Sequence, residues 1–409
     1  GLCVYVSFCH SYFQSKNAFL SRSAGGNAFA ASKLNDTVGW RSRAYINMDA
    51  RTQTSWGTVQ TVLSVAIRSR SGVFNNSGGF GAGGQNTANP QVYAAYIRFA
   101  GFTFGRADAN FFFMPSKTWF TGYWGQSSNG AVQLAYTATF GGGFSATLAL
   151  EDHNDSRQAT RANRLAGAPG VVNPTRMPNI VANLRLDQGW GTAFLAGVFV
   201  RNSFVTSAGV PVSVSKNGWA VSGGLMFNLP ALAKGDKLYL HAAFSNGAIS
   251  HIMPPYLNGD RSDGRAMGGY MRNEENVTLF ACGATVCAES VKGWSIGAVL
   301  THFWTPTIHS NFAVSYVSLT PGSVSRATDW YTGGGLGKAS AWATSANLVW
   351  SPTKGFDIGL EVHYRAVRQS LAGTGVVTPY GSAALSPLTV GTQKNPNVFL
   401  TKIRVQRTF

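Results

Sequence analysis

The chain has 409 residues, including 48 glycines, and only 12% of its residues are charged, against roughly 25% in an average soluble domain. This shortage of charge argues against an ordinary cytosolic enzyme. A membrane-spanning helix is also excluded, because it needs about 20 consecutive apolar residues. The longest apolar windows, such as GTAFLAGVFV, end after about ten. A transmembrane β-strand needs only about 9 to 11 residues that alternate between apolar and polar.

The first nine residues, GLCVYVSFC, are expected to form a strand. Residues 1–12 lack a positively charged region followed by an apolar core, so no signal peptide is predicted and the chain is interpreted as mature and processed. Cys3 and Cys9 could pair, but in one extended strand they would lie too far apart to bridge.

Alternation with a period of two then runs along almost the whole chain. In WRSRAYINMDAR, Arg41, Arg43 and Asp49 share one face, while Trp40 and Ile46 share the other. The segments GTVQTVLSVAIRSR and FDIGLEVHYR divide in the same way. A pleated strand requires this period, and a register slip of one residue would move the arginines to the apolar face.

The connections give a second regularity, because short and long links alternate. Short links are expected near residues 52–56, 100, 141–143, 188–190, 304–307 and 351–355. Long links are expected near residues 71–90, 107–130, 153–177, 246–291, 320–339 and 369–395. Outer-membrane barrels alternate tight periplasmic turns with long extracellular loops in this way. About fifteen strand-like segments follow residue 38, and the N-terminal segment makes about sixteen.

A soluble sandwich or propeller also has alternating strands and turns. Its outward face, however, usually carries Lys and Glu in quantity, whereas charge here is scarce. Tryptophans lie near the expected strand ends, as membrane-interface girdles require: Trp40, Trp56, Trp190, Trp219, Trp294, Trp304, Trp342 and Trp350. The sequence therefore predicts an all-β fold, a transmembrane antiparallel β-barrel of about sixteen strands in one domain, 1–409.

The last segment, TKIRVQRTF, ends on Phe409 with apolar residues at alternate positions before it. It resembles the C-terminal recognition signal of bacterial outer-membrane barrels. As the last strand it must pair with the first, because an open sheet edge is not tolerated in lipid.

A narrower resemblance follows from the segments DTVGWRSRAYINMDARTQTSWGTVQTVL, AYIRFAGFTFGRADANFF, GGFSATLALED and SPTKGFDIGLEVHY and from the ending VQRTF. Together they resemble the alphaproteobacterial outer-membrane porin family (porin family 2). The resemblance implies a sixteen-stranded, water-filled, homotrimeric channel in the bacterial outer membrane, without a cofactor. The N-terminus departs from the family pattern of an IPGTDTC-like start, which leaves the first strand and first loop open.

The family folds one loop inward to narrow the channel, and the segment 107–130 after FGRA holds that position. It carries Asp108 and Lys117 among many aromatic residues. Asp108 is expected to face a basic wall across the channel. The alternative is that Asp108 only caps a turn and that the aromatics cover a subunit interface or the membrane rim.

Cationic side chains outnumber acidic ones on the expected inward positions. When the barrel closes, Arg41, Arg43, Lys402 and Arg404 should form one basic wall. The residues expected to line the pore and set selectivity are Arg41, Arg43, Arg68, Arg98, Arg106, Asp108, Lys117, Glu361, Lys402 and Arg404. Rings of Arg or Lys favour anions, and the net charge of +17 acts in the same direction. Part of this charge could instead contact lipopolysaccharide phosphates through loop arginines.

Other readings of the sequence are weaker. Cys282 and Cys287 bracket GATV in the long extracellular loop 246–291, where a disulfide is expected, and no spaced cluster supports a metal site. The basic charge lacks a nucleic-acid-binding motif. His309 and Ser310 point to opposite faces of a strand and cannot share a proton, so no enzyme is expected.

Two functional hypotheses remain. The first is a general diffusion channel for small hydrophilic solutes and ions. The second is a substrate-specific channel, or a barrel with a structural or adhesive role. Few aromatic residues are expected on the inward face of the strands, namely Tyr45, Tyr96 and Tyr239, and this favours the general channel over one with an aromatic sugar track.

Overall fold

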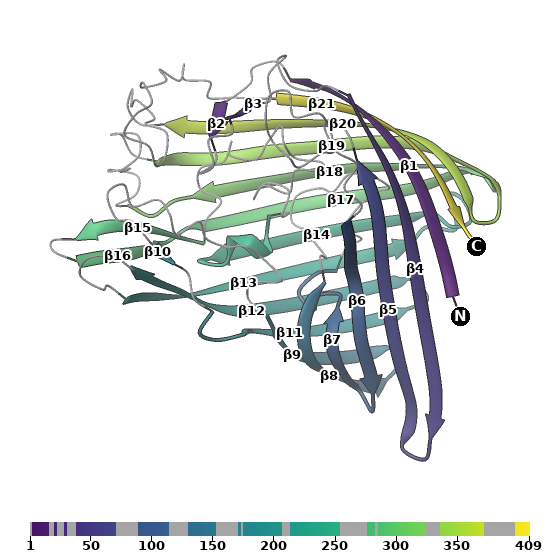
Figure 1. The fold of residues 1–409 in the computed structure, drawn as a ribbon, viewed down its shortest axis with the longest axis horizontal. Helices are drawn as coiled ribbons and strands as arrows, with labels where there is room; N and C mark the ends of the chain where they lie inside the picture. The colour runs from purple at the N-terminus through teal and green to yellow at the C-terminus, as the bar shows by residue number, and fades with distance from the viewer. Residues whose placement is uncertain are drawn as a thin grey trace.

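The computed structural model is all-β (Figure 1). It describes residues 2–15, 20–22, 28–30, 38–70, 89–113, 130–152, 171–172, 175–206, 213–253, 276–282, 285–323, 336–371 and 397–409. No helix in these ranges is long and apolar enough to cross a membrane. That the whole chain forms one domain stays a prediction.

Sixteen of the strands follow one another in hydrogen-bonded order. The first eight are β1 (Leu2–Ser15), β4 (Val38–Thr54), β5 (Gly57–Arg70), β6 (Asn89–Phe99), β7 (Phe102–Ala107), β8 (Ala131–Gly141), β9 (Phe144–Glu151) and β11 (Asn179–Gln188). The next eight are β12 (Gly191–Thr206), β13 (Ser213–Asn228), β14 (Lys237–Asn246), β17 (Lys292–Thr305), β18 (Ile308–Thr320), β19 (Leu336–Thr353), β20 (Phe356–Leu371) and β21 (Asn397–Thr408).

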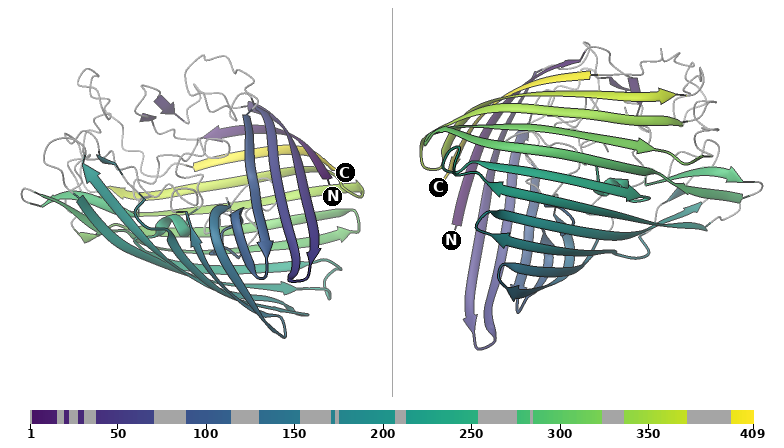
Figure 2. Two further views of the ribbon diagram at one scale, coloured as in Figure 1. Left: turned by 60° about the horizontal axis from the view of Figure 1, so that its bottom comes forward. Right: turned by 180° about the vertical axis from the view of Figure 1, so that it is seen from behind.

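The pairing returns to the strand on which it starts. β1 pairs antiparallel with β21 on one side and with β4 on the other, so that Cys9 lies opposite both Arg404 and Arg41. All pairings between neighbours in this ring are antiparallel. The expected pairing of the terminal strands is therefore confirmed, and both termini lie close together (Figures 1 and 2).

Smaller elements lie in the connections. β10 (Val171–Val172) pairs with the end of β12. β2 (Leu20–Arg22) and β3 (Ala28–Ala30) form one short hairpin, and β15 (Val277–Cys282) and β16 (Thr285–Ser290) form another. A 3-10 turn, η3 (Ile249–His251), follows β14. Cys3 and Cys9 lie in the one strand β1, six residues apart at about 3.3 Å per residue, so they do not bridge each other.

The two faces of the barrel strands have an inverted distribution of polarity. On β4 the apolar side chains Trp40, Ile46 and Met48 are 40 to 51% exposed, whereas Arg41 and Arg43 are buried. The buried polar set also includes residues of β9, β20 and β21. The exposed apolar face is the outer face and the polar face is the inner face, as the alternation of the sequence predicts.

Aromatic side chains gather on the outer face at both ends of the strands. The eight tryptophans expected in girdles are all exposed: Trp40, Trp56, Trp190, Trp219, Trp294, Trp304, Trp342 and Trp350. At one end the rings of Trp294, Tyr316 and Trp342 contact one another in sequence, with centroids 5.1 and 4.6 Å apart. At the turn end, Trp190 and Phe227 lie 5.7 Å apart. The girdle prediction is therefore confirmed.

One irregularity changes the face of a side chain. Between β5 and β6 the register shifts, because Ser64 pairs with Ala94 and Val65 pairs with Val92. The extra residue, Tyr93, is left between them in a bulge, where strict alternation fails. Its ring lies 5.1 Å from that of Tyr45 on the inner face. The sequence-based set of inward aromatics missed Tyr93 for this reason.

Candidate functional site

The basic wall predicted from the sequence, Arg41, Arg43, Lys402 and Arg404, is assembled by three neighbouring strands. Arg41 and Arg43 lie on β4, Lys402 and Arg404 lie on β21, and β1 runs between them. Adjacent strands are about 4.8 Å apart, so the Arg41 and Arg404 backbones, both opposite Cys9, are separated by about 10 Å. Arg41, Arg43 and Lys402 are each at most 8% exposed. The expected clustering of these four cations on one wall is what the register shows.

The neighbouring strand β20 adds a further cation and an acid. Register places Glu361 opposite Lys402, and the carboxylate also accepts a hydrogen bond from Asn347 at 3.4 Å. Four residues further along β20, Arg365 is 2% exposed and donates to His363. Arg365 lies on the same inner face and was not among the expected selectivity residues, although its position in FDIGLEVHYR already indicated an inward side chain.

Two arginines on the inner face lie over the ring of a tyrosine two residues away on the same strand, and one of them also contacts a tyrosine on the second strand along. Arg43 donates to the Tyr45 hydroxyl, and its guanidinium carbon lies 5.4 Å from the Tyr45 ring centre and 5.7 Å from that of Tyr93. Arg98 lies 4.7 Å from the centre of the Tyr96 ring. Cation–π contacts of this kind orient a guanidinium without neutralising it.

The first residues of the expected constriction loop, 108–113, form a stem that is fixed to the inner face of β8 to β13. The backbone N–H, the backbone carbonyl and the side-chain NH2 of Asn110 all have partners there. Its backbone N–H donates to Glu151 at 2.7 Å, its side-chain amide donates to Glu151 at 2.9 Å and to Gln133, and its carbonyl accepts from Asn183 at 2.8 Å. Because Glu151 is only 1% exposed, this carboxylate acts as an anchor for the stem.

The next residues of the stem pack against the same region through aromatic rings. Phe111 is buried, and its carbonyl accepts from the Ser222 hydroxyl at 3.2 Å. Phe113 stacks on Phe194 with centroids 5.4 Å apart, and it covers Gly224, where a Cβ would overlap its ring. The described stem, 108–113, therefore runs along the inner face of β8, β9, β11, β12 and β13.

These two regions face each other across the ring. β12 is eight strands from β1 in both directions. The basic wall is centred on β1, and the stem lies on strands on both sides of β12. The inner face is thus cationic on one side and covered by an apolar loop stem on the other.

The other predicted pore-lining residues have different outcomes. Arg98 is exposed on the inner face, but register places Arg106 opposite Val132, on the face that carries Phe104, so the register does not support a pore-lining Arg106. Because alternate residues of a strand point to opposite faces, Arg106 does not share the face of the inward side chains. The Asp108 side chain is exposed, and the backbone carbonyl of Asp108 accepts from the Gln133 side chain at 2.9 Å.

Two expected residues cannot be placed in the same way. Lys117 lies outside the described residues, in 114–129. Arg68 is opposite Arg43 in the register of β4 and β5, and its side chain is not part of the described structure.

Exposed ion pairs line the inner face near the short turns. Arg51 pairs with Asp49 at 2.9 Å, and Arg185 pairs with Asp187 at 2.7 Å. Each pair lies on one strand, two residues apart, and is exposed. Such pairs neutralise each other locally, so the net cationic character of the inner face comes mainly from the basic wall.

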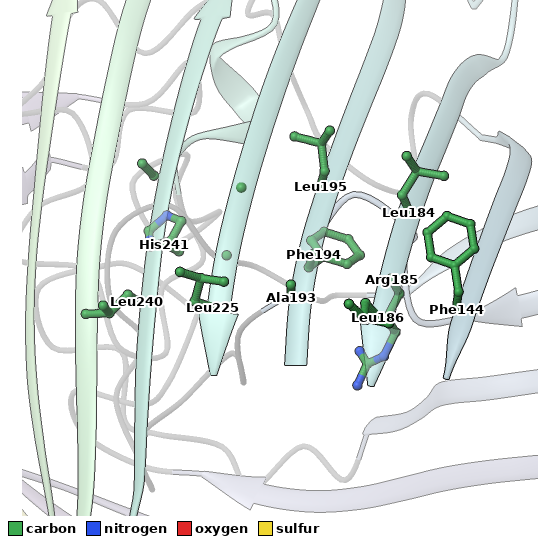
Figure 3. A pocket seen from close by; sticks show the side chains of 13 residues that line it. Phe144, Leu184, Arg185, Leu186, Ala193, Phe194, Leu195, Leu225, Leu240 and His241 are labelled. Carbon is green, nitrogen blue, oxygen red and sulfur yellow. The ribbon is translucent and has the colours of Figure 1, made fainter. Parts of the chain in front are cut away.

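A hollow of about 590 Å³ lies over β11 to β14 (Figure 3). Leu184, Leu195 and Leu225 border it with 40 to 56% of their surface exposed, and the small residues Gly223 and Ala242 lie between such side chains. Its apolar border belongs to the outer face. It is therefore not the site at which a hydrophilic solute would be recognised.

Two further expectations concern cysteine and serine chemistry. Cys287 on β16 is disulfide-bonded, and the side chain of its expected partner Cys282 lies outside the described residues. Ser310 accepts from the outer-face indole of Trp304 at 2.9 Å, whereas the His309 ring lies 5.0 Å from Phe303. His309 and Ser310 thus use different faces, as expected. Within the described ranges, no three His, Cys, Asp or Glu side chains lie together as metal ligands would.

An apolar outer face with aromatic girdles around a polar inner face defines a bacterial outer-membrane β-barrel of the channel type. The family model described as "Porin subfamily" matches residues 12–392. The chain belongs to this porin family, and the resemblance found in the sequence is confirmed.

Similarity to curated relatives is confined to part of the chain. Porin Omp2b from Brucella canis and from Brucella abortus are each 30% identical over 185 residues, which is 42% of this chain and 46% of the relative. The matched part of the chain thus spans about half the length of these relatives.

Solved structures support the fold over the full length. The outer-membrane channel DcaP of Acinetobacter baumannii has a TM-score of 0.61 at 13% identity and covers 100% of this chain and 96% of its own. Pseudomonas putida OprB has a TM-score of 0.52 at 11% identity, with 100% and 93% covered. At these identities the likeness concerns the fold alone. The family match and the fold together make the chain a porin.

Proposed function

We propose that this porin is a general diffusion channel through which small hydrophilic solutes and ions cross the outer membrane down their gradients, and that its pore prefers anions. The observation that carries the proposal is the basic wall: four cations on β4 and β21, with Arg365 on β20 beside them. Among the described residues, Glu361 is the acid in register with this wall. Cationic side chains in a confined pore favour anions.

The net charge of the chain supports the same preference. With 33 Lys and Arg against 16 Asp and Glu, the formal charge is +17, and a positive field concentrates anions at a pore mouth. The contribution of exposed charge fades as salt shortens the Debye length to roughly 10 Å at 0.1 M. Buried cations such as those of the basic wall are screened less.

Solute flux into liposomes tests the general channel. We expect swelling rates that fall smoothly with solute size and rise linearly with concentration, together with stepwise conductance in planar bilayers. A barrel without conductance would instead favour a structural or adhesive role.

One observation favours a substrate-specific channel as a second candidate. Tyr45, Tyr93 and Tyr96 lie on the inner side of β4 and β6, with Arg43 and Arg98 over their rings. Clustered tyrosine rings beside cations have the chemistry to recognise a sugar or an aromatic anion. Flux that saturates at low concentration of one such solute, and that loses saturation in Tyr93→Ala, would select this alternative.

The assembly and surroundings of the channel are proposed on the family resemblance. We expect a homotrimer, because cyclic association would bury part of the outer face of each subunit. Lipopolysaccharide is the expected partner of the loop arginines, which lie outside the described residues: Arg157, Arg161, Arg164, Arg261 and Arg272. Chemical cross-linking in detergent would show a trimer if this is correct.

A further inference from the structure

The connection after β14 enters the barrel before it leaves it. Residues 247–253 contain η3, and Ala248, Ile249 and Ile252 are fully buried. They belong to one apolar cluster with inner-face residues of the wall, including Val200 on β12 and Leu319 on β18. The fit is close, because a Cβ at Gly293 would come within 2.8 Å of the Ile252 Cδ1 atom. The segment is therefore a packed layer on the inside of the wall.

This layer also contacts the loop stem. The His251 ring meets the Phe111 ring edge-to-face with centroids 5.3 Å apart, and it lies parallel to the Phe112 ring at 6.3 Å. Phe111 and His251 are each 1% exposed. Two segments more than a hundred residues apart in the sequence thus form one body inside the barrel.

A buried polar network holds the layer against the wall. Asn276 accepts from the Ser250 N–H at 3.1 Å and donates to the Asn202 side chain on β12 at 3.0 Å. Asn202 in turn donates to the Gly247 carbonyl at 2.9 Å. Because Asn276 and Asn202 are fully buried, water does not readily replace these bonds when one partner is removed.

Asn276 also lies at the base of the β15–β16 hairpin. The Asn276 carbonyl accepts from the Val291 N–H at 3.0 Å, and the Val291 carbonyl accepts from the Gly247 N–H at 2.8 Å. β15 starts at the next residue, Val277. Asn276 thus joins the base of the β15–β16 hairpin, the segment 247–253 and the wall strand β12.

We propose that residues 247–253 form a second constriction element of the pore, and that Asn276 and Asn202 are the positioning residues that hold it. The inference rests on the proposed channel function, because its effect is read as ion flow. The loop stem lies on β8 to β13, and residues 247–253 pack beside it in the apolar cluster that includes Val200 on β12 and Leu319 on β18. The second element supports the stem, because the His251 ring packs against Phe111 and Phe112. Both segments therefore narrow the same half of the lumen.

Single-channel conductance of the full chain tests the proposal, with Asn276→Ala and Asn202→Ala as variants. We expect conductance to rise on the order of 1.5-fold, with more open-channel noise, because current follows the open cross-section. Asn228→Ala is the matched control. Asn228 donates to the Gly189 carbonyl at 3.1 Å at the turn end, away from this network, and the variant should conduct like the wild type.

A folding check and a milder variant keep the test decisive. The heat-modifiable shift on electrophoresis reports barrel assembly in each variant. If Asn276→Ala does not assemble, Asn202→Ala, which removes the bonds to Asn276 and Gly247 but keeps the bond from Ser250 to Asn276, should show the same rise at smaller size.

The outcomes separate the two proposals. A wild-type barrel that does not conduct would reject the channel function itself. A wild type that conducts, together with assembled Asn276 and Asn202 variants that match it in conductance and noise, would overturn the second constriction element and leave the channel function in place. Conductance that rises equally in Asn228→Ala would overturn it too.

Discussion

The inner face around β20, β21 and β4 differs from the inner face around β11 to β14. The first presents Arg365, Lys402 and Arg41, and register pairs them with few acids. The second presents Gly224, Ala220 and Val198, and it is covered by the loop stem. One side of the barrel therefore concentrates cationic side chains, whereas the other side uses its surface to fix the loop stem and residues 247–253.

The two halves also use buried carboxylates differently. Glu151 binds the loop stem, since both the backbone N–H and the side-chain amide of Asn110 donate to the Glu151 carboxylate. Glu361 lies within the basic wall, opposite Lys402. An inward acid on a barrel strand is therefore not automatically a selectivity residue, because its partner decides its role.

The largest effect on stability should come from filling the space over Gly224 that the Phe113 ring occupies. Gly224→Val places side-chain atoms where the Phe113 ring lies, so the ring must leave. We expect the free energy of unfolding to fall by about 3 kcal/mol, the upper range for overpacking, and the conductance to rise. Gly223→Val is the control, because a Cβ at Gly223 comes no closer than 3.9 Å to another heavy atom. Equal loss of stability in both would contradict this position of the Phe113 ring.

A smaller effect is expected at the carboxylate anchor. Glu151→Gln retains the shape of the side chain and loses the charge-assisted bonds to Asn110. We expect a loss of about 1 to 2 kcal/mol in unfolding by denaturant, with noisier single-channel current. Asp187→Asn breaks an exposed pair with Arg185 and should change stability by less than about 0.5 kcal/mol. If Asp187→Asn cost as much as Glu151→Gln, the anchor would not be special.

The smallest effect concerns a site outside both halves. In the turn before β14, burial acts to raise the pKa of Asp236, but hydrogen bonds from His302 at 2.6 Å and from the Phe303 N–H at 2.8 Å outweigh it and hold the pKa below its ordinary value. A lowered carboxyl pKa stabilises the fold above the unfolded-state value of about 3.9, and this contribution is lost as the pH falls through the folded value.

Thermal melting between pH 3 and pH 7 checks this site. The wild type should be more stable than Asp236→Asn near pH 7, and the difference should shrink as the pH drops below about 4. A difference that stays constant over the whole range would show that the carboxylate charge has no part in it.

Regular alternation made much of the fold predictable. Trp40, Ile46 and Met48 on one face and Arg41 and Arg43 on the other follow directly from a period of two. The count of strand-like segments then predicted about sixteen strands, and the need to remove open sheet edges predicted the pairing of the terminal strands. These features depend on local pattern, which a single sequence contains.

Features that depend on three-dimensional fit were not predictable. Tyr93 turns inward because of a bulge, and alternation has no signal for the extra residue. The inward path of residues 247–253 depends on partners as remote as Phe111 and Asn202. The expectation for Arg106 is a different case, because alternation from Phe104 already places Arg106 on the face of Val132, as the register does.

The most direct test of the account is the zero-current potential across a planar bilayer under a KCl gradient, for the wild type and for a variant with Arg41, Arg43 and Arg404 changed to Gln and Lys402 to Met. We expect an anion-selective potential in the wild type that moves towards zero in the variant, while Arg51→Gln, from an exposed pair near the turns, leaves it nearly unchanged. A cation-selective wild type, or a variant with the wild-type potential, would contradict it.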